Sequence, residues 1–120
     1  TDICVPISRL AECVRETQAD IQEHGLICPI VGHVGDGNFH TSPMFDMQNP
    51  AEKRVIEGFI ERLTARALRM EGTCTGEHGV GQGKIKYLKA EHGPGLEVMR
   101  SVKTALDPLN ILNPRKILPA

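Results

Sequence analysis

The chain has 120 residues, of which 40% are hydrophobic and 24% charged, and its 14 basic and 15 acidic side chains give a net charge of -1. These values are typical of a globular domain with one core, and 3% aromatic residues without a basic excess argue against nucleic-acid binding. No apolar run approaches the roughly 20 residues that cross a bilayer, so no membrane span is expected. The first residues also lack the basic and apolar regions of a secretion signal.

The first half of the chain alternates predicted strands and helices. Residues 2–7 alternate apolar and polar side chains and predict a strand. A helix is predicted next, capped by Ser8 and ended by Gly25. Residues 26–31 form a short apolar run and residues 38–45 alternate again, so both are predicted strands. Because the first strand starts abruptly, we expect the domain to begin upstream.

A second long helix is predicted after these strands. Asn49 supplies a capping side chain, Pro50 suits the first helical position, and Glu52 completes a capping box. The helix is expected to end at Gly72 and to be followed by a short strand over 73–75. The order β-α-β-β-α-β predicts an α+β fold, namely a ferredoxin-like antiparallel sheet with helices on one face.

The last third of the chain is predicted to be helical and then irregular. Two helices are expected near 84–90 and 94–106. Residues 107–120 contain too many prolines for a regular element. We therefore expect extra helices and an irregular C-terminal tail after the ferredoxin-like part.

The stretch "GHVGDGNFH" predicts a hairpin, because the Asp-Gly pair at 36–37 is preferred in two-residue type I′ turns. In that register His33 lies opposite His40, with Cβ atoms about 4.5–5.5 Å apart. Two imidazoles at this separation can bind one ion at roughly 2.0–2.1 Å each. Asn38 and Ser42 share the face of His40 and are candidate substrate contacts. Two such histidines are also compatible with a polar pair on a solvated sheet, so a metal site needs a third ligand.

The stretch "GEHGVGQG" contains a candidate third ligand. Glu77 would complete a two-histidine, one-carboxylate set with open coordination positions, as in catalytic ion sites. In extended backbone the next residue, His78, points to the opposite side and is available as a general base. The stretch fits neither a Walker A loop nor a dinucleotide fingerprint, whereas an anion-binding nest or a flexible glycine connector remain alternatives.

Four stretches carry a resemblance that covers nearly the whole chain: "TDICVPISRL", "PIVGHVGDGNFH", "EGTCTGEHGVGQGKIKYL" and "EHGPGLEVMRSVKTALDPLNILNPRKIL". They are similar to the C-terminal part of the FAD-linked oxidases that act on D-2-hydroxy acids. That family includes D-lactate dehydrogenase (cytochrome), the glycolate oxidase D subunit and D-2-hydroxyglutarate dehydrogenase. The first stretch resembles the D-lactate and glycolate branch most. The resemblance implies a fragment of a flavin-dependent dehydrogenase that oxidises a D-2-hydroxy acid to the 2-oxo acid.

The resemblance also implies roles for individual residues. It implies three ligands of a zinc or manganese ion, which are His33, His40 and Glu77. It implies that His78 accepts the hydroxyl proton, that Ser42 contacts substrate, and that Asn113 in the tail contacts the flavin. Relatives more commonly have "NPGK" where this chain has "NPRK", so Arg115 replaces a glycine.

Domain organisation and partners follow from the same resemblance. Residues 1–106 are expected to form the C-terminal half of a substrate or cap domain. Residues 107–120 are expected to pack on an FAD-binding domain that this chain does not contain. The expected partners are the hydroxy acid, that domain with its FAD, and an electron acceptor, so the isolated fragment is expected to be inactive. A cytoplasmic location is expected, or a mitochondrial one in a eukaryote, with peripheral membrane association through the acceptor.

Two alternatives from other classes remain. Two histidines and one carboxylate also suit a free-standing mononuclear non-haem iron enzyme. A small non-catalytic ferredoxin-like module is the second alternative, in which the histidines would bind no metal.

Overall fold

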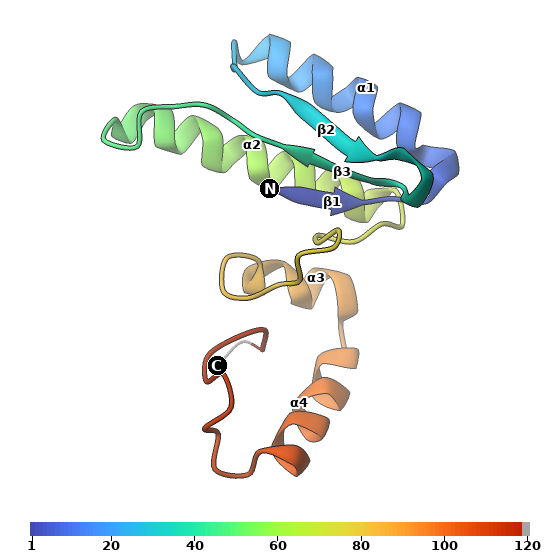
Figure 1. Cartoon of the computed structure of the whole chain (residues 1–120), viewed down its shortest axis with the longest axis vertical. Helices are drawn as coiled ribbons and strands as arrows, with labels where there is room; N and C mark the ends of the chain where they lie inside the picture. The colour runs from blue at the N-terminus through green and yellow to red at the C-terminus, as the bar shows by residue number, and fades with distance from the viewer. Residues whose placement is uncertain (119–120) are drawn as a thin grey trace. The chain divides into compact units, whose positions relative to one another are not determined.

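The computed structural model describes residues 1–118, which divide into two compact units, Thr1–Glu77 and a second unit that starts at His78. Figure 1 labels the helices and strands. The first unit contains, in order, β1 (Asp2–Cys4), α1 (Ile7–Glu23), β2 (Ile30–His33), the 3-10 turn η1 (Val34–Asp36), β3 (Asn38–Thr41) and α2 (Pro50–Arg69). The second contains η2 (Ile85–Tyr87), α3 (Leu88–His92) and α4 (Gly95–Leu106).

The sheet of the first unit is antiparallel with the strand order β1-β3-β2. On the free edge of β1, Cys4 and Thr73 form an isolated antiparallel bridge through two backbone hydrogen bonds of 3.3 and 2.8 Å. This arrangement confirms the predicted α+β class and has the strand order of a ferredoxin-like sheet. The predicted strand over 73–75 is wrong in extent, because pairing with β1 stops after the one bridge.

Both long helices cover the same face of the sheet (Figure 1). The core between them is built by alternate strand residues and by helix residues at helical spacing. Its buried members are Ile3, Val5, Leu10, Cys13, Phe39, Phe59, Leu63, Ala67 and Met70. Because Phe39 and Ile3 are opposed in the β1–β3 register, both point to the helices. The residues next to them in sequence, which include Asp2, Asn38 and His40, therefore lie on the other face.

Prolines shorten three of the predicted strands. A proline has no backbone N–H to donate to a strand ladder. Pro6 follows β1, Pro29 precedes β2 and Pro43 follows β3, so the strands are shorter than the predicted ranges 2–7, 26–31 and 38–45. Beyond Pro29 and Pro43, the two outer segments meet only in an isolated bridge between Ile27 and Met44.

The start of α1 also differs from the prediction. The helix begins at Ile7 with Pro6 as its N-cap, and no side-chain cap hydrogen bond is found there, so the predicted cap at Ser8 is wrong. The backbone of Pro6 explains the early start, because its carbonyl accepts the first helical hydrogen bond from Arg9 at 2.8 Å. The end agrees with the prediction, since Gly25 follows the helix with a left-handed φ of 62°.

The start of α2 has the predicted capping side chain and proline but lacks the backbone bond of a capping box, because the N–H of Asn49 donates to Asp46 O at 2.9 Å. The Asn49 side chain accepts hydrogen bonds from the backbone N–H groups of Ala51 (3.0 Å) and Glu52 (3.4 Å). The Glu52 carboxylate in turn accepts from Asn49 Nδ2 at 2.8 Å. Pro50 occupies the first helical position, where a missing N–H costs nothing. The other end of the helix lies at Arg69, shortly before the predicted Gly72.

We expect Asn49→Ala to destabilise the protein by about 1 kcal/mol, because two helical N–H groups lose their acceptor. The free energy of unfolding in urea measures this effect. Gln48→Ala, a change at the exposed neighbour outside the helix, is the matched control and should leave stability within about 0.5 kcal/mol of the original. Equal stability of the two variants would contradict the capping role.

A charged network joins α1 to α2 next to the core. The Asp20 carboxylate, 6% exposed, accepts two hydrogen bonds of 3.1 Å from Arg62 Nε and one of 2.7 Å from Arg62 Nη2. It also accepts one of 2.9 Å from Arg66 Nη2. Arg66 is itself buried and donates a second bond to the Thr17 hydroxyl at 3.0 Å. This network fixes the packing of the two helices beneath the sheet.

The second unit confirms the two predicted helical segments and the irregular tail. Within its described residues, 107–118 contain no helix or strand, and residues 119–120 of the predicted tail lie outside the described part. Asp107 closes the end of α4 by pairing with Lys103 and accepting from the N–H groups of Ile111 (3.0 Å) and Leu112 (2.9 Å). The hydrogen bond from Lys103 holds the pKa of Asp107 below its ordinary value. Within residues 1–118, no helix is both long and apolar enough to cross a membrane.

Candidate metal centre

The hairpin that carries both candidate histidines has a different turn from the one predicted. Strands β2 and β3 are joined by η1 and by Gly37, which has a left-handed φ of 73°. A Cβ at Gly37 would lie 2.1 Å from the carbonyl oxygen of Val5, and Val5 N–H donates to Gly37 O at 3.0 Å. The turn is therefore set by its contact with the residue after β1, which a local turn rule does not include.

This turn shifts the strand register by two residues. His33 lies opposite Asn38, and Val31 lies opposite His40, so the predicted pairing of the two histidines is wrong. Because side chains alternate with a period of two, a shift of two leaves each residue on its predicted face. His33 and His40 are thus diagonal neighbours on one face, with ring centroids 5.7 Å apart and planes at 89°.

Glu77 joins the two histidines in the first unit. Its Oε1 lies 3.3 Å from His33 Nε2 and 3.2 Å from His40 Nε2. These ligand atoms all lie within 4.8 Å of one another. The side chain of His40 is 20% exposed, whereas those of His33 and Glu77 are 58% and 53% exposed, so one side of the cluster is open to solvent. The three residues predicted as ligands are therefore brought together from a hairpin and a distant loop.

The geometry of this cluster fits a divalent ion. Two ligands at about 2.0–2.1 Å from a tetrahedral ion lie about 3.3 Å apart, close to the separations between Glu77 and each histidine. Two imidazoles and one carboxylate are a ligand set found in catalytic zinc sites. The exposed side of the cluster leaves room for further ligands such as water or substrate oxygens.

Three further residues were predicted to contact substrate or flavin: Asn38, Ser42 and Asn113. Asn38 is 5% exposed, and its Nδ2 donates to the Ile3 carbonyl at 2.9 Å, while its buried Oδ1 has no protein partner among the described residues. Ser42 lies just beyond β3, where its N–H donates to Pro29 O at 3.1 Å, so strand alternation no longer sets its face. Asn113 is an exposed residue of the tail with a left-handed φ of 47°.

His78 directly follows Glu77 and is exposed. The chain bends at 76–78, so the extended backbone on which its predicted direction rested is wrong. The bend arises because the N–H groups of Gly76 and Glu77 turn toward the Asp2 carboxylate, at 2.8 and 3.0 Å.

Asp2 is a site residue that sequence analysis missed. It was assigned only to a strand start, yet β1 places it opposite His40 and next to the backbone of Glu77. No local motif signals this role, because Asp2 and Glu77 are separated by 75 positions in sequence.

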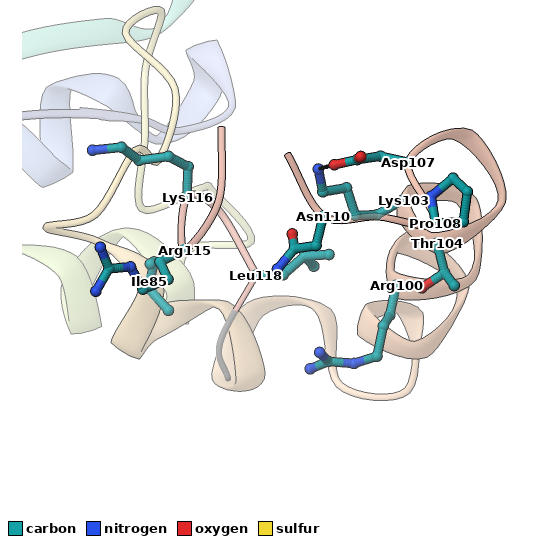
Figure 2. A pocket seen from close by; sticks show the side chains of 10 residues that line it. All are labelled: Ile85, Arg100, Lys103, Thr104, Asp107, Pro108, Asn110, Arg115, Lys116 and Leu118. Atoms are coloured by element: carbon teal, nitrogen blue, oxygen red, sulfur yellow. Dashed lines mark hydrogen bonds and ion pairs between the residues drawn. The ribbon is translucent and has the colours of Figure 1, made fainter. Parts of the chain in front are cut away.

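The second unit contains a cavity of about 530 Å³ between α4 and the tail (Figure 2). Several basic residues line it, and Lys103 is paired with Asp107. Figure 2 shows that the charged ends of Arg100, Arg115 and Lys116 lie apart from one another and do not meet at one point. The cavity therefore gathers no convergent set of charges comparable to the histidine and carboxylate cluster.

Comparison with known proteins identifies the family. Residues 1–117 match the family model described as FAD linked oxidases, C-terminal domain. The chain belongs to this family. It is 51% identical over 119 residues to the probable mitochondrial D-lactate dehydrogenase of Danio rerio. The matched region covers 98% of this chain and 24% of that protein.

Other relatives have similar coverage. The mitochondrial D-lactate dehydrogenase [cytochrome] of Arabidopsis thaliana is 46% identical over 120 residues, covering 99% of this chain and 21% of that protein. The glycolate oxidase subunit GlcD of Bacillus subtilis is 36% identical over 117 residues, covering 97% of this chain and 25% of that protein. The chain thus spans about a quarter or less of the length of these relatives.

Proposed function

We propose that this chain is the metal- and substrate-binding part of a flavin-dependent dehydrogenase that oxidises a D-2-hydroxy acid of the D-lactate or glycolate class. The observation that carries the proposal is the convergence of His33, His40 and Glu77 on one point in a member of the FAD-linked oxidase family. The names of the relatives supply the class of substrate, since they are D-lactate dehydrogenases and a glycolate oxidase subunit.

The proposed site assigns separate tasks to its residues. His33, His40 and Glu77 would hold a zinc or manganese ion. Such an ion would supply Lewis acidity that polarises a bound hydroxyl and helps to orient the substrate. His78 would take the hydroxyl proton, since imidazole suits proton transfer near neutral pH. FAD supplies the hydride acceptor when it is bound, chiefly outside this chain.

Further parts of the proposal concern binding and partners. Asn38 lies on the face of the cluster, and its contact with substrate remains a prediction. A contact of Ser42 with substrate and of Asn113 with flavin remain predictions. The division into a cap-domain half and a tail that packs on the FAD-binding domain is also a prediction. So are a cytoplasmic location, or a mitochondrial one in a eukaryote, and peripheral membrane association through an electron acceptor.

The metal content of the full-length protein tests the proposed ion site. About one zinc or manganese per chain is expected by mass spectrometry after purification without chelator. Loss of a residue that only orients a metal ligand typically lowers metal affinity ~10–100-fold. His40→Ala removes a ligand itself, so its loss of affinity should be larger. The expected result is therefore a protein purified with almost no metal.

The matched control is Val31→Ala, which changes the exposed residue directly opposite His40 on the same sheet face. This variant should retain its metal. Equal metal in His40→Ala and the original protein would contradict the site. Iron with oxygen-dependent turnover and no flavin would favour the free-standing metalloenzyme, and a full-length protein that binds neither metal nor substrate would favour the non-catalytic module.

A further inference from the structure

We propose that Asp2 is a positioning residue of the metal centre, whose carboxylate holds the backbone of residues 76–77 so that Glu77 faces the two histidines. This inference rests on the proposed ion-binding role of the cluster. It adds a group that acts through the ligand Glu77.

Asp2 is buried and binds the backbone of the loop that carries Glu77. The residue is 4% exposed, and one of its oxygens, Oδ2, accepts from Gly76 N at 2.8 Å and from Glu77 N at 3.0 Å. A buried carboxylate is costly without hydrogen-bond donors, and bonds to a charged acceptor are stronger than neutral ones. The loop and the carboxylate therefore stabilise each other in this arrangement.

The fit of Gly76 shows how closely the loop approaches the sheet. A Cβ at this position would lie 2.7 Å from Asp2 Oδ2 and 1.7 Å from Asn38 Nδ2. Any side chain at 76 would thus push the loop away from both residues. Asn38 cannot easily yield, because its Nδ2 is held by the Ile3 carbonyl at 2.9 Å. Asp2 and Asn38 together form a seat that only a glycine can occupy.

The anchor matters because the Glu77 side chain is 53% exposed. Packing restrains an exposed side chain weakly, so the position of the Glu77 backbone decides where its carboxylate lies. The strand register connects this anchor to the ligands, since Asp2 is paired with His40 across β1 and β3. A neighbour that orients a metal ligand typically contributes 10–100-fold to metal affinity.

The test is a metal titration of the full-length protein with Asp2→Ala and Asp2→Asn. After removal of bound metal, Co²⁺ is added and its affinity and visible absorption spectrum are measured. Asp2→Ala is expected to weaken Co²⁺ affinity about 10–100-fold and to change the spectrum, because Glu77 loses its anchor. Asp2→Asn keeps an acceptor oxygen and is expected to recover most of the affinity.

Two controls separate positioning from charge and from folding. Asp36→Ala removes the same charge from an exposed position of the histidine hairpin and should keep the original affinity. Urea unfolding of the metal-free variants shows that each is folded under the titration conditions.

The outcomes distinguish this inference from the proposed function. Original affinity and spectrum in folded Asp2→Ala, or an equal loss in Asp36→Ala, would overturn the role of Asp2 while leaving the ion site intact. A full-length protein that binds no Co²⁺ before any substitution would overturn the ion site and this inference together.

Discussion

His78→Ala in the full-length protein is expected to lower kcat for oxidation of D-lactate or glycolate by about 10²–10⁴-fold while leaving the metal content unchanged. The physical reason is that the hydroxyl proton must leave as the hydride is removed, and alanine cannot accept it. His78 directly follows Glu77, so the proposed base and a proposed metal ligand lie on the same loop. Turnover is measured with an artificial electron acceptor, and metal by mass spectrometry.

A matched histidine substitution makes this result interpretable. His92→Ala removes an imidazole from the end of α3 in the same unit as His78, and turnover should not change. Added imidazole is expected to restore part of the activity of His78→Ala, which a purely structural role would not allow. A kcat for His78→Ala equal to that of the original protein would exclude this residue as the proton acceptor.

Asp20→Ala is expected to destabilise the protein by about 1–3 kcal/mol, because the buried Arg66 guanidinium loses one of its two carboxylate partners and keeps only Glu16, at 3.3 Å. The contribution of Arg62 is smaller, since its side chain is 41% exposed and solvent screens it. Urea unfolding measures the loss. Glu12→Ala breaks the exposed pair between Arg9 and Glu12 and should cost no more than about 1 kcal/mol. Equal losses in the two variants would contradict the assignment.

The same network predicts how stability depends on pH. Burial by itself would raise the pKa of Asp20, but hydrogen bonds and charge from Arg62 and Arg66 outweigh it and hold the pKa below its ordinary value. The unfolded chain then binds this proton at higher pH than the folded one. The stability that Asp20 contributes is therefore complete above the unfolded pKa of about 3.9 and is lost as pH falls through the lower folded pKa. Asp20→Asn should flatten the unfolding free energy over this acid range.

The candidate ligands could be predicted from the sequence although their pairing was not. The Asp-Gly dipeptide indicated a two-residue turn, whereas contact of Gly37 with Val5 gives a longer connection. The resulting shift is an even number of residues, so His33 and His40 remain on one face. An odd shift would have placed one of them in the core. The alternation along β3 therefore predicted the face of each residue correctly, whereas the turn type predicted the wrong register.

The sequence by itself determined the order of helices and strands, the capping of α2 and the residue types of the ion site. These features depend on neighbours within a few positions, where spacing and hydrogen-bonding capacity are readable directly. Only the tertiary structure decided the strand register, the network around Asp20 and the seat that Asp2 and Asn38 form for Gly76. Each of those depends on side chains that meet across long stretches of chain, so their partners and distances exist only once the helices pack on the sheet.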